Sequence, residues 1–197
     1  MLFNSYEFIF LYLPIVLVVY FFLGSRKKYE FATTWLVLSS IFFYGYWDCR
    51  YVALLLASIC FNYIIGRMIE RKSRKRIFLI IGLAVNILLL GYYKYTGFFM
   101  EQINATMGTD MIIPHIVLPL GISFFTFQAI SYVIDIYKQD TKVQKNLLNM
   151  GLYISFFPQL IAGPIVRYKT IAEQIEGRKE SFEKFSRRSN TIYKRAI

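Results

Sequence analysis

The sequence predicts an all-α, polytopic membrane protein with about five full spans and a sixth segment that prolines break or turn back. Composition, apolar blocks of nearly bilayer thickness, and basic residues between the blocks support this prediction. Of the 197 residues, 56% are hydrophobic, 19% aromatic and 18% charged, and the mean hydropathy is +0.44. A soluble domain of this length has about a quarter of its residues charged. An ordinary soluble protein and a disordered one are therefore excluded.

Six apolar segments approach the length of a spanning helix, which needs about 20 residues to cross a hydrocarbon core of about 30 Å. They are residues 8–24, 31–47, 51–66, 77–93, 116–134 and 147–166. Several are short, so we expect small tilts and interfacial aromatic residues to set their depth. The first segment lacks the basic flank and the cleavage site of a secretory signal, and we interpret it as a retained span.

The basic residues lie mainly in connections on one predicted side of the membrane. The 23 Lys and Arg against 12 Asp and Glu give a net charge of +11, which in a soluble protein suggests nucleic acid. Here the excess lies between the apolar blocks, so we expect a topology role and no nucleic-acid partner. The positive-inside rule places 25–30, 67–76 and 135–146 in the cytoplasm, and the basic-poor 48–50 and 94–115 opposite. Five spans then alternate, with the N-terminus outside.

The sixth segment conflicts with this alternation. A full crossing would place the tail after it, with nine basic residues from 167 to 197, on the outside. Pro158 and Pro164 interrupt the segment, and each removes a helical hydrogen bond. We therefore predict a broken or re-entrant segment that returns the chain to the cytoplasm. Such backbone needs protein or water to satisfy its polar groups, so we hypothesise that residues 156–167 line a cavity.

This division gives residues 1–168 as the membrane part and 169–197 as a polar cytoplasmic tail. The tail is either an amphipathic helix on the membrane surface or a solvated terminus. In the fifth span, Gln128, Ser131, Tyr132 and Asp135 share one helical face by their spacing. Polar residues in a span either mark a substrate or proton path or hydrogen-bond neighbouring helices. Both alternatives stay open.

Other polar residues have simpler interpretations. Ser58, Asn62 and Gly66 form a small, polar stripe on the third span, and Asn86 lies in the fourth. We interpret all four as packing contacts. The lone His115 has no nucleophile arranged with it, and with only two cysteines, Cys49 and Cys60, no metal site is expected.

Three phrases of the sequence resemble a known family. They are LPLGISFFTFQ at 118–128, YVIDIY at 132–137 and FFPQLIAGPIVRY at 156–168. Together, in this order and spacing, they resemble the membrane-bound O-acyltransferase family. The resemblance points to its bacterial branch, the alginate O-acetylation protein and the D-alanyl transferase of teichoic acids. It runs from residue 1 to about residue 183, and the family pattern is lost after about residue 185.

The resemblance implies an all-helical funnel in the bacterial inner membrane. No bound cofactor is implied: the acyl donor, a thioester or an acylated carrier, arrives from the cytoplasm as co-substrate. The acceptor is an exported polysaccharide, and accessory acetylation proteins assist. The expected function is transfer of an acyl group, acetyl by preference, to hydroxyls of a polysaccharide such as alginate. Transport or export through a broken helix is the alternative from another class.

The family's catalytic histidine lies in a later span, and His115 does not match it. We therefore expect an N-terminal portion, made by truncation, frameshift or gene fragmentation, that is inactive alone. An inactive, membrane-anchored fragment is a further alternative. The resemblance implies that eight residues belong to the funnel wall and its cytoplasmic mouth: Gln128, Asp135, Pro158, Gln159, Gly163, Pro164, Arg167 and Tyr168. The planar guanidinium of Arg167 either binds an anionic donor or is a topology anchor that holds this part of the chain at the membrane interface.

Overall fold

The structure, a computed structural model of the chain, describes residues 5–71, 74–109, 112–114, 116–162 and 167–170, with backbone only for 161 and 162. Its elements, in chain order, are η1 (Glu7–Tyr12), α1 (Leu13–Ser25), α2 (Tyr29–Trp47), η2 (Cys49–Tyr51), α3 (Val52–Arg71), α4 (Lys75–Met107), α5 (Ile122–Tyr137), α6 (Leu147–Ser155) and α7 (Phe157–Ala162). Every element of the described part is helical, which confirms the predicted all-α class there.

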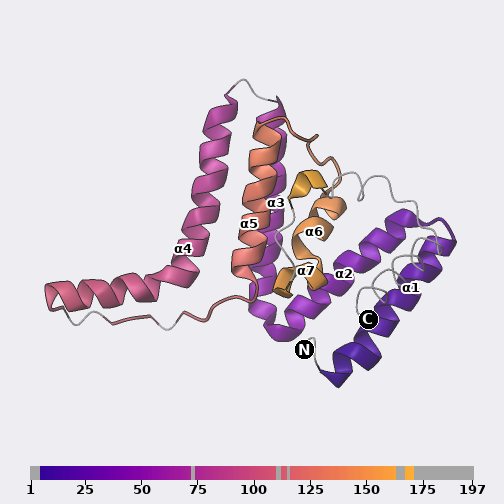
Figure 1. Cartoon of the computed structure of the whole chain (residues 1–197), viewed down its shortest axis with the longest axis horizontal. Helices are drawn as coiled ribbons and strands as arrows, with labels where there is room; N and C mark the ends of the chain where they lie inside the picture. Colours follow the sequence, from indigo (N-terminus) through magenta and orange to yellow (C-terminus); the bar gives the residue numbers. More distant parts are fainter. Residues whose placement is uncertain (1–4, 72–73, 110–111, 115, 163–166, 171–197) are drawn as a thin grey trace, which may run out of the picture.

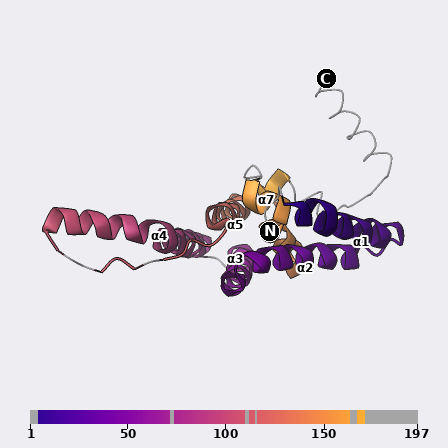
Figure 2. The same ribbon diagram turned by 90° about the horizontal axis from the view of Figure 1, so that it is seen from below.

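The helices pack in an elongated layer. α5 packs against α3 and α4, while α2 packs against α1 and α6. Figures 1 and 2 show α4 at one extreme of this layer and the pair α1 and α2 at the other, with α5, α6 and α7 between them. The buried side chains divide accordingly. A larger cluster joins α3, α5 and α6, and a smaller one joins η1, α1, α2 and the start of α7.

Three stretches of the described residues are long and apolar enough to cross a membrane: Glu7–Ser25, Cys49–Arg71 and Lys75–Met107. Ile122–Tyr137 is apolar but shorter, and its 16 residues rise about 24 Å at about 1.5 Å each. The membrane character is therefore supported, and the number of five full spans stays a prediction.

The helix that contains the fourth predicted span is longer than that span. α4 continues past residue 93 to Met107 and stops only at Gly108, whose φ of 63° is left-handed. A left-handed glycine is a common helix terminator, and no proline interrupts the helix before it. Figure 1 shows α4 bending sharply, so that its C-terminal part runs away from α5. Most of the predicted connection 94–115 is therefore helix.

The start predicted for the fifth span was wrong. Residues 116–120 are not helical, and α5 begins at Ile122. Pro119 lacks an N–H group for a helix that would start earlier, and Gly121 has a left-handed φ of 65°. Because a left-handed residue does not continue a right-handed helix, the chain turns at Gly121 before α5 begins.

The predicted break in the sixth segment is present. α6 ends at Ser155, and Phe156 has φ −56° and ψ 109°, which is not helical. α7 then begins at Phe157, so Pro158 lies in its first turn. A proline is tolerated there, because that N–H has no helical partner, whereas in a continuous helix its ring would clash with the preceding turn. Pro164 lies outside the described residues.

Two asparagines hydrogen-bond α3 to α4. The Asn86 side-chain amide donates to Asn62 Oδ1 at 2.8 Å, and the Asn62 amide donates to Asn86 Oδ1 at 3.3 Å. Each amide also donates to a carbonyl of its own helix, that of Gly82 at 2.7 Å and that of Ser58 at 2.9 Å. Both side chains are buried. The predicted packing role of these residues is confirmed.

Asn62→Ala is expected to destabilise the chain by about 1–3 kcal/mol, because it removes the donor to the buried Asn86 Oδ1 and one of the two acceptors of the Asn86 amide. Replacing both residues by leucine is expected to cost less than either single change to alanine, since no polar group is then left unsatisfied. Unfolding free energies from denaturant titration in mixed micelles would measure both. A free-energy cost of the double replacement equal to the sum of the two single costs would contradict a shared hydrogen-bonded pair.

Candidate functional site

The broken segment begins and ends beside the same part of α5, near Tyr132. Before α6, the Gln144 backbone N–H donates to the Tyr132 hydroxyl at 3.4 Å, and the Gln144 side-chain amide donates to the Tyr168 hydroxyl at 3.1 Å. Between these contacts the chain passes Leu160, whose carbonyl oxygen lies against Gly121 at the other end of α5. Gly121 and Tyr132 lie about 16 Å apart along the axis of α5, which rises about 1.5 Å per residue. The chain therefore runs along α5 and returns.

The return ends in three tyrosines packed edge to face, which we call the tyrosine cluster: Tyr132, Tyr153 and Tyr168. The Tyr168 ring lies edge-on to Tyr132, with centroids 4.9 Å apart, and edge-on to Tyr153, with centroids 5.1 Å apart. Edge-to-face pairs at this separation are favourable beyond the area that they bury. Tyr168 is 0% exposed. The cluster therefore fixes the returning chain against α5 and α6.

Gly66 on α3 provides the space for this cluster. A Cβ at residue 66 would lie 2.7 Å from Cε1 of the Tyr132 ring and would also overlap its hydroxyl. Only glycine lets the ring approach the α3 backbone so closely. The small stripe predicted on the third span therefore has a specific packing partner.

The side chain of Asp135 binds the backbone of the same stretch of chain. Asp135 Oδ2 accepts the Lys169 backbone N–H at 3.3 Å, and Asp135 is buried. The Arg167 carbonyl accepts the Thr170 N–H at 3.0 Å, which closes a turn. Arg167 itself is exposed. Asp135 and Tyr168 thus hold a turn that presents Arg167 at the surface.

The basic connections gather at this end of the bundle. The Tyr63 hydroxyl near the end of α3 donates to the Lys145 carbonyl at 2.8 Å, and Arg67 donates to that hydroxyl at 3.4 Å. Tyr137, the last residue of α5, shares a cavity wall with the residues that open α4, Arg74–Ile77. The connections 67–76 and 138–146 therefore share one end with Arg167. The membrane face of this end stays a prediction.

Gln128 lies deeper in the bundle on α5. It is 1% exposed, and its side-chain oxygen has no hydrogen-bond partner among the described residues. The same holds for the Thr126 hydroxyl, two residues earlier. The Gln128 backbone carbonyl accepts the Tyr153 hydroxyl at 3.2 Å. A buried acceptor without a partner costs about 1–3 kcal/mol, so this face of α5 offers a hydrogen-bond acceptor to a further group.

The structure thus brings part of the predicted site together. Asp135, Arg167 and Tyr168 share the C-terminal end of α5, while Pro158 and Gln159 lie on α7 at its opposite end. Gly163 and Pro164 lie outside the described residues. The cavity predicted for residues 156–167 is untested, because residues 163–166 of that stretch are not described.

Sequence reasoning missed Gln144 and Tyr153. Gln144 lies in a polar connection where nothing marks it apart from its neighbours, and Tyr153 is one aromatic residue among many. Their roles depend on contacts across 24 and 25 residues of chain. Within the described residues, no three His, Cys, Asp or Glu side chains are grouped as metal ligands. The groups present are suited to positioning the chain and to holding an anion at the surface.

The chain is similar to known acetyl-transferring proteins. A protein named probable alginate O-acetylase from Pseudomonas syringae pv. tomato is 36% identical over 94% of this chain, and the match covers 37% of that relative. A peptidoglycan O-acetyltransferase from Helicobacter pylori is 38% identical over 92% of this chain and 40% of its own length. A probable alginate O-acetylase from Pseudomonas aeruginosa is 36% identical over 94% of this chain and 36% of its own.

The chain therefore spans about two fifths of the length of these relatives. No family model matches it. No solved structure matches it either.

Proposed function

We propose that this chain, which is of the membrane-bound O-acyltransferase type, is the N-terminal portion of an enzyme that transfers acetyl groups to polysaccharide hydroxyls. The observation that carries the proposal is 36–38% identity over at least 92% of the chain to relatives named as O-acetylases and O-acetyltransferases. As an N-terminal portion, it is inactive until the remainder of the enzyme supplies the catalytic base.

The returning segment supports a role in binding the acyl donor. Arg167 is exposed on a turn that Asp135 and the buried Tyr168 hold in place. Lys169, two residues later, is also exposed, as is Lys145 next to the Gln144 that donates to Tyr168, and exposed cations attract an anion. A thioester or acylated carrier that bears phosphate would meet the planar Arg167 fork as it enters from the cytoplasm. Pro158, Gln159, Gly163 and Pro164 belong to the proposed funnel wall.

The acceptor is a sugar hydroxyl of an exported polysaccharide such as alginate. The Helicobacter pylori relative favours peptidoglycan as a second candidate, because its identity is as high as that of the alginate relatives. The proposed place is the bacterial inner membrane, with the N-terminus outside, the tail in the cytoplasm, and accessory acetylation proteins as partners. In this arrangement the basic end of the bundle faces the donor.

A chimera tests the function. This chain would replace the matching part of the Pseudomonas aeruginosa alginate O-acetylase in cells that lack it, and the acetyl content of secreted alginate would be measured. We expect acetylation to be restored with the chimera and to be absent with the 197-residue chain alone. A chimera that is stably inserted and yields unacetylated alginate would contradict the proposal, and an acetylated peptidoglycan in such cells would indicate the second acceptor.

In the same chimera, Arg167→Ala is expected to lower acetylation at least about tenfold, since a charge-assisted bidentate pair is worth more than about 1.4 kcal/mol. Arg167→Lys should recover only part of it, because lysine lacks the planar fork. Arg50→Ala is the matched control: its side chain is 88% exposed and belongs to η2, at the other end of α3. Full acetylation by the Arg167→Ala chimera would leave the topology anchor as its role.

A further inference from the structure

Helix α4 is too long to lie wholly inside a bilayer. Its 33 residues rise about 50 Å at about 1.5 Å each, whereas the hydrocarbon core is about 30 Å thick. Even a tilt of about 40°, the upper end of the range for membrane helices, would bring only about 39 Å of helix into the core. Part of α4 must therefore lie outside the core.

The structure shows which part of α4 leaves the bundle. The buried residues of this helix are Gly82, Asn86 and Leu90, and no later residue of α4, all of which the structure describes, is buried. Tyr93 still packs edge-on against Tyr51, with ring centroids 6.0 Å apart. Figure 1 shows the C-terminal part of α4 turning across the direction of α3 and α5, and Figure 2 shows it extending away from the other helices. The helix therefore leaves the bundle after Tyr93.

A side-chain hydrogen bond lies at this departure. The Thr96 hydroxyl donates to the Tyr92 carbonyl at 2.7 Å, and such a bond to the carbonyl four residues earlier often bends a helix. Gly91 lies just before it, and a Cβ at that residue would meet no atom within 4 Å. Packing therefore does not require this glycine, and its backbone freedom suits a bend.

Residues 94–107 of α4, which we call the α4 arm, are amphipathic. One face carries apolar residues at intervals of four, which we call the arm stripe: Tyr95, Phe99, Ile103 and Met107. Their side chains are 42%, 59%, 39% and 73% exposed, in that order. The opposite face carries small and polar residues: Lys94, Gly97, Glu101 and Asn104. The arm thus presents an uncovered apolar face and a polar one.

The threonine hydroxyls of the arm are satisfied inside the helix. Besides the bond of Thr96, the Thr106 hydroxyl donates to the Gln102 carbonyl at 2.8 Å. Neither hydroxyl therefore needs a partner from outside the chain. Such a surface is suited to lipid, whose acyl chains offer no hydrogen bonds.

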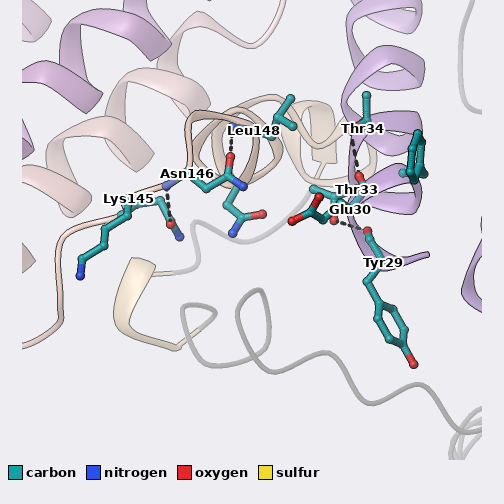
Figure 3. A pocket seen from close by; sticks show the side chains of 10 residues that line it. Tyr29, Glu30, Thr33, Thr34, Lys145, Asn146 and Leu148 are labelled. Carbon is teal, nitrogen blue, oxygen red and sulfur yellow. Dashed lines mark hydrogen bonds between the residues drawn. The ribbon is translucent and has the colours of Figure 1, made fainter. Parts of the chain in front are cut away.

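The two ends of α4 differ in charge. The helix begins with Arg74, Lys75 and Arg76 along one cavity wall, and Figure 3 shows a second cavity, of about 500 Å³, between α2 and the connection that contains Lys145 at that same basic end. Residues 94–109 contain one base and one acid, so their formal net charge is zero. Anionic lipid is therefore attracted to the basic end, whereas the arm can bind a bilayer only through apolar contact.

We propose that the α4 arm lies in the bilayer interface on the face opposite to the basic end, with the arm stripe among the acyl chains. The spanning part of α4 fixes the direction of the membrane normal, and the arm runs across that direction, so it lies along the surface. Lys94 and Glu101 on its opposite face then meet water. Tyr92 and Tyr93 lie at the junction, and tyrosine is enriched at this depth in membrane proteins.

Spin labels on single cysteines test the proposal in the full chain, reconstituted in phosphatidylcholine nanodiscs with Cys49 and Cys60 replaced by serine. Phe99→Cys and Ile103→Cys carry labels on the stripe, and Glu101→Cys is the matched control on the opposite face. Collisions with oxygen, which concentrates in lipid, and with a water-soluble nickel chelate measure depth. We expect the stripe labels about 5–10 Å inside the boundary between head groups and acyl chains, and the Glu101→Cys label in water.

A reference label at Ile87→Cys, on an exposed residue of the spanning part, should lie deeper than either stripe label. The depths should be the same in phosphatidylglycerol nanodiscs, because the arm has no net charge. Circular dichroism identical to wild type would show that each variant is folded, and Met107→Cys is a further stripe position if one of the others fails to fold.

Three results would overturn the proposal. Equal nickel collisions on both faces of the arm would place it in water, and equal depth on both faces would place it wholly inside the bilayer. Protection of the stripe labels from both oxygen and nickel would show that protein, such as a second copy of the chain, covers the stripe. None of these results depends on acetyl transfer.

Discussion

Tyr168→Ala is expected to lower the free energy of unfolding by about 3–5 kcal/mol, the range for removal of a fully buried aromatic ring. Tyr168 is 0% exposed and stacks edge-on between Tyr132 and Tyr153. The change removes both aromatic pairs and the acceptor of the Gln144 side-chain amide. Because this residue ends the returning segment, the loss should also free the turn that presents Arg167.

Denaturant titration in mixed micelles measures the stability, and the rate of thiol labelling at an engineered Thr170→Cys measures the release of the turn. Tyr92→Ala is the control, because Tyr92 lies on α4 and is mostly exposed, so its removal should change stability by less than about 0.5 kcal/mol. Tyr168→Phe keeps the ring and should cost about 1–3 kcal/mol through the unpaired Gln144 amide. A Tyr168→Ala variant as stable as Tyr92→Ala would show that the segment does not depend on the cluster.

Gly121→Ala is expected to destabilise the chain by about 2–4 kcal/mol at the other end of the returning segment. Two costs combine. The left-handed φ of 65° is unfavourable for alanine by about 1–2 kcal/mol, and the new Cβ would lie 2.6 Å from the Leu160 carbonyl oxygen. Since that oxygen belongs to the backbone of α7, no side chain can rotate away, and α7 itself must shift.

Gly97→Ala is the matched control, because a Cβ at Gly97 meets no atom within 4 Å and the residue lies inside α4. There the same substitution should stabilise the helix by about 0.5–1 kcal/mol. The same titration measures both variants, and equal stability of the two would contradict the close contact between α7 and Gly121. Combined with Tyr168→Ala, the Gly121 cost should add, since Tyr132, which Tyr168 contacts, lies about 16 Å from Gly121 along α5.

Local sequence rules correctly predicted the break but not the helix ends near it. Pro158 excludes a continuous helix wherever the rest of the chain lies, so the interruption at Phe156 follows from local geometry alone. The predicted start at residue 116 was wrong, and α4 continues past the predicted span end at residue 93, because both predicted ends came from counting apolar residues. Backbone geometry decided both ends instead, through the left-handed Gly108 and Gly121.

The candidate site was only half visible for a similar reason. Asp135 and Tyr168 could be carried over from a motif, but the role of Asp135 depends on the Lys169 backbone N–H, 34 residues away. Gln144 and Tyr153 belong to no motif and gain their roles from the same return of the chain. Polar contacts between distant residues leave no periodic pattern, because each requires two segments whose relative place the sequence does not state.

By itself, the sequence determined the all-helical class, the membrane character, the break before Pro158 and the resemblance to acyltransferases, since apolar length, proline chemistry and motif order act locally. Only the tertiary structure decided that the broken segment returns to the end of α5 where it began, and that Tyr168 and Asp135 hold Arg167 there. The physical reason is packing: three tyrosines and one glycine must meet across four separate segments before that return is stable.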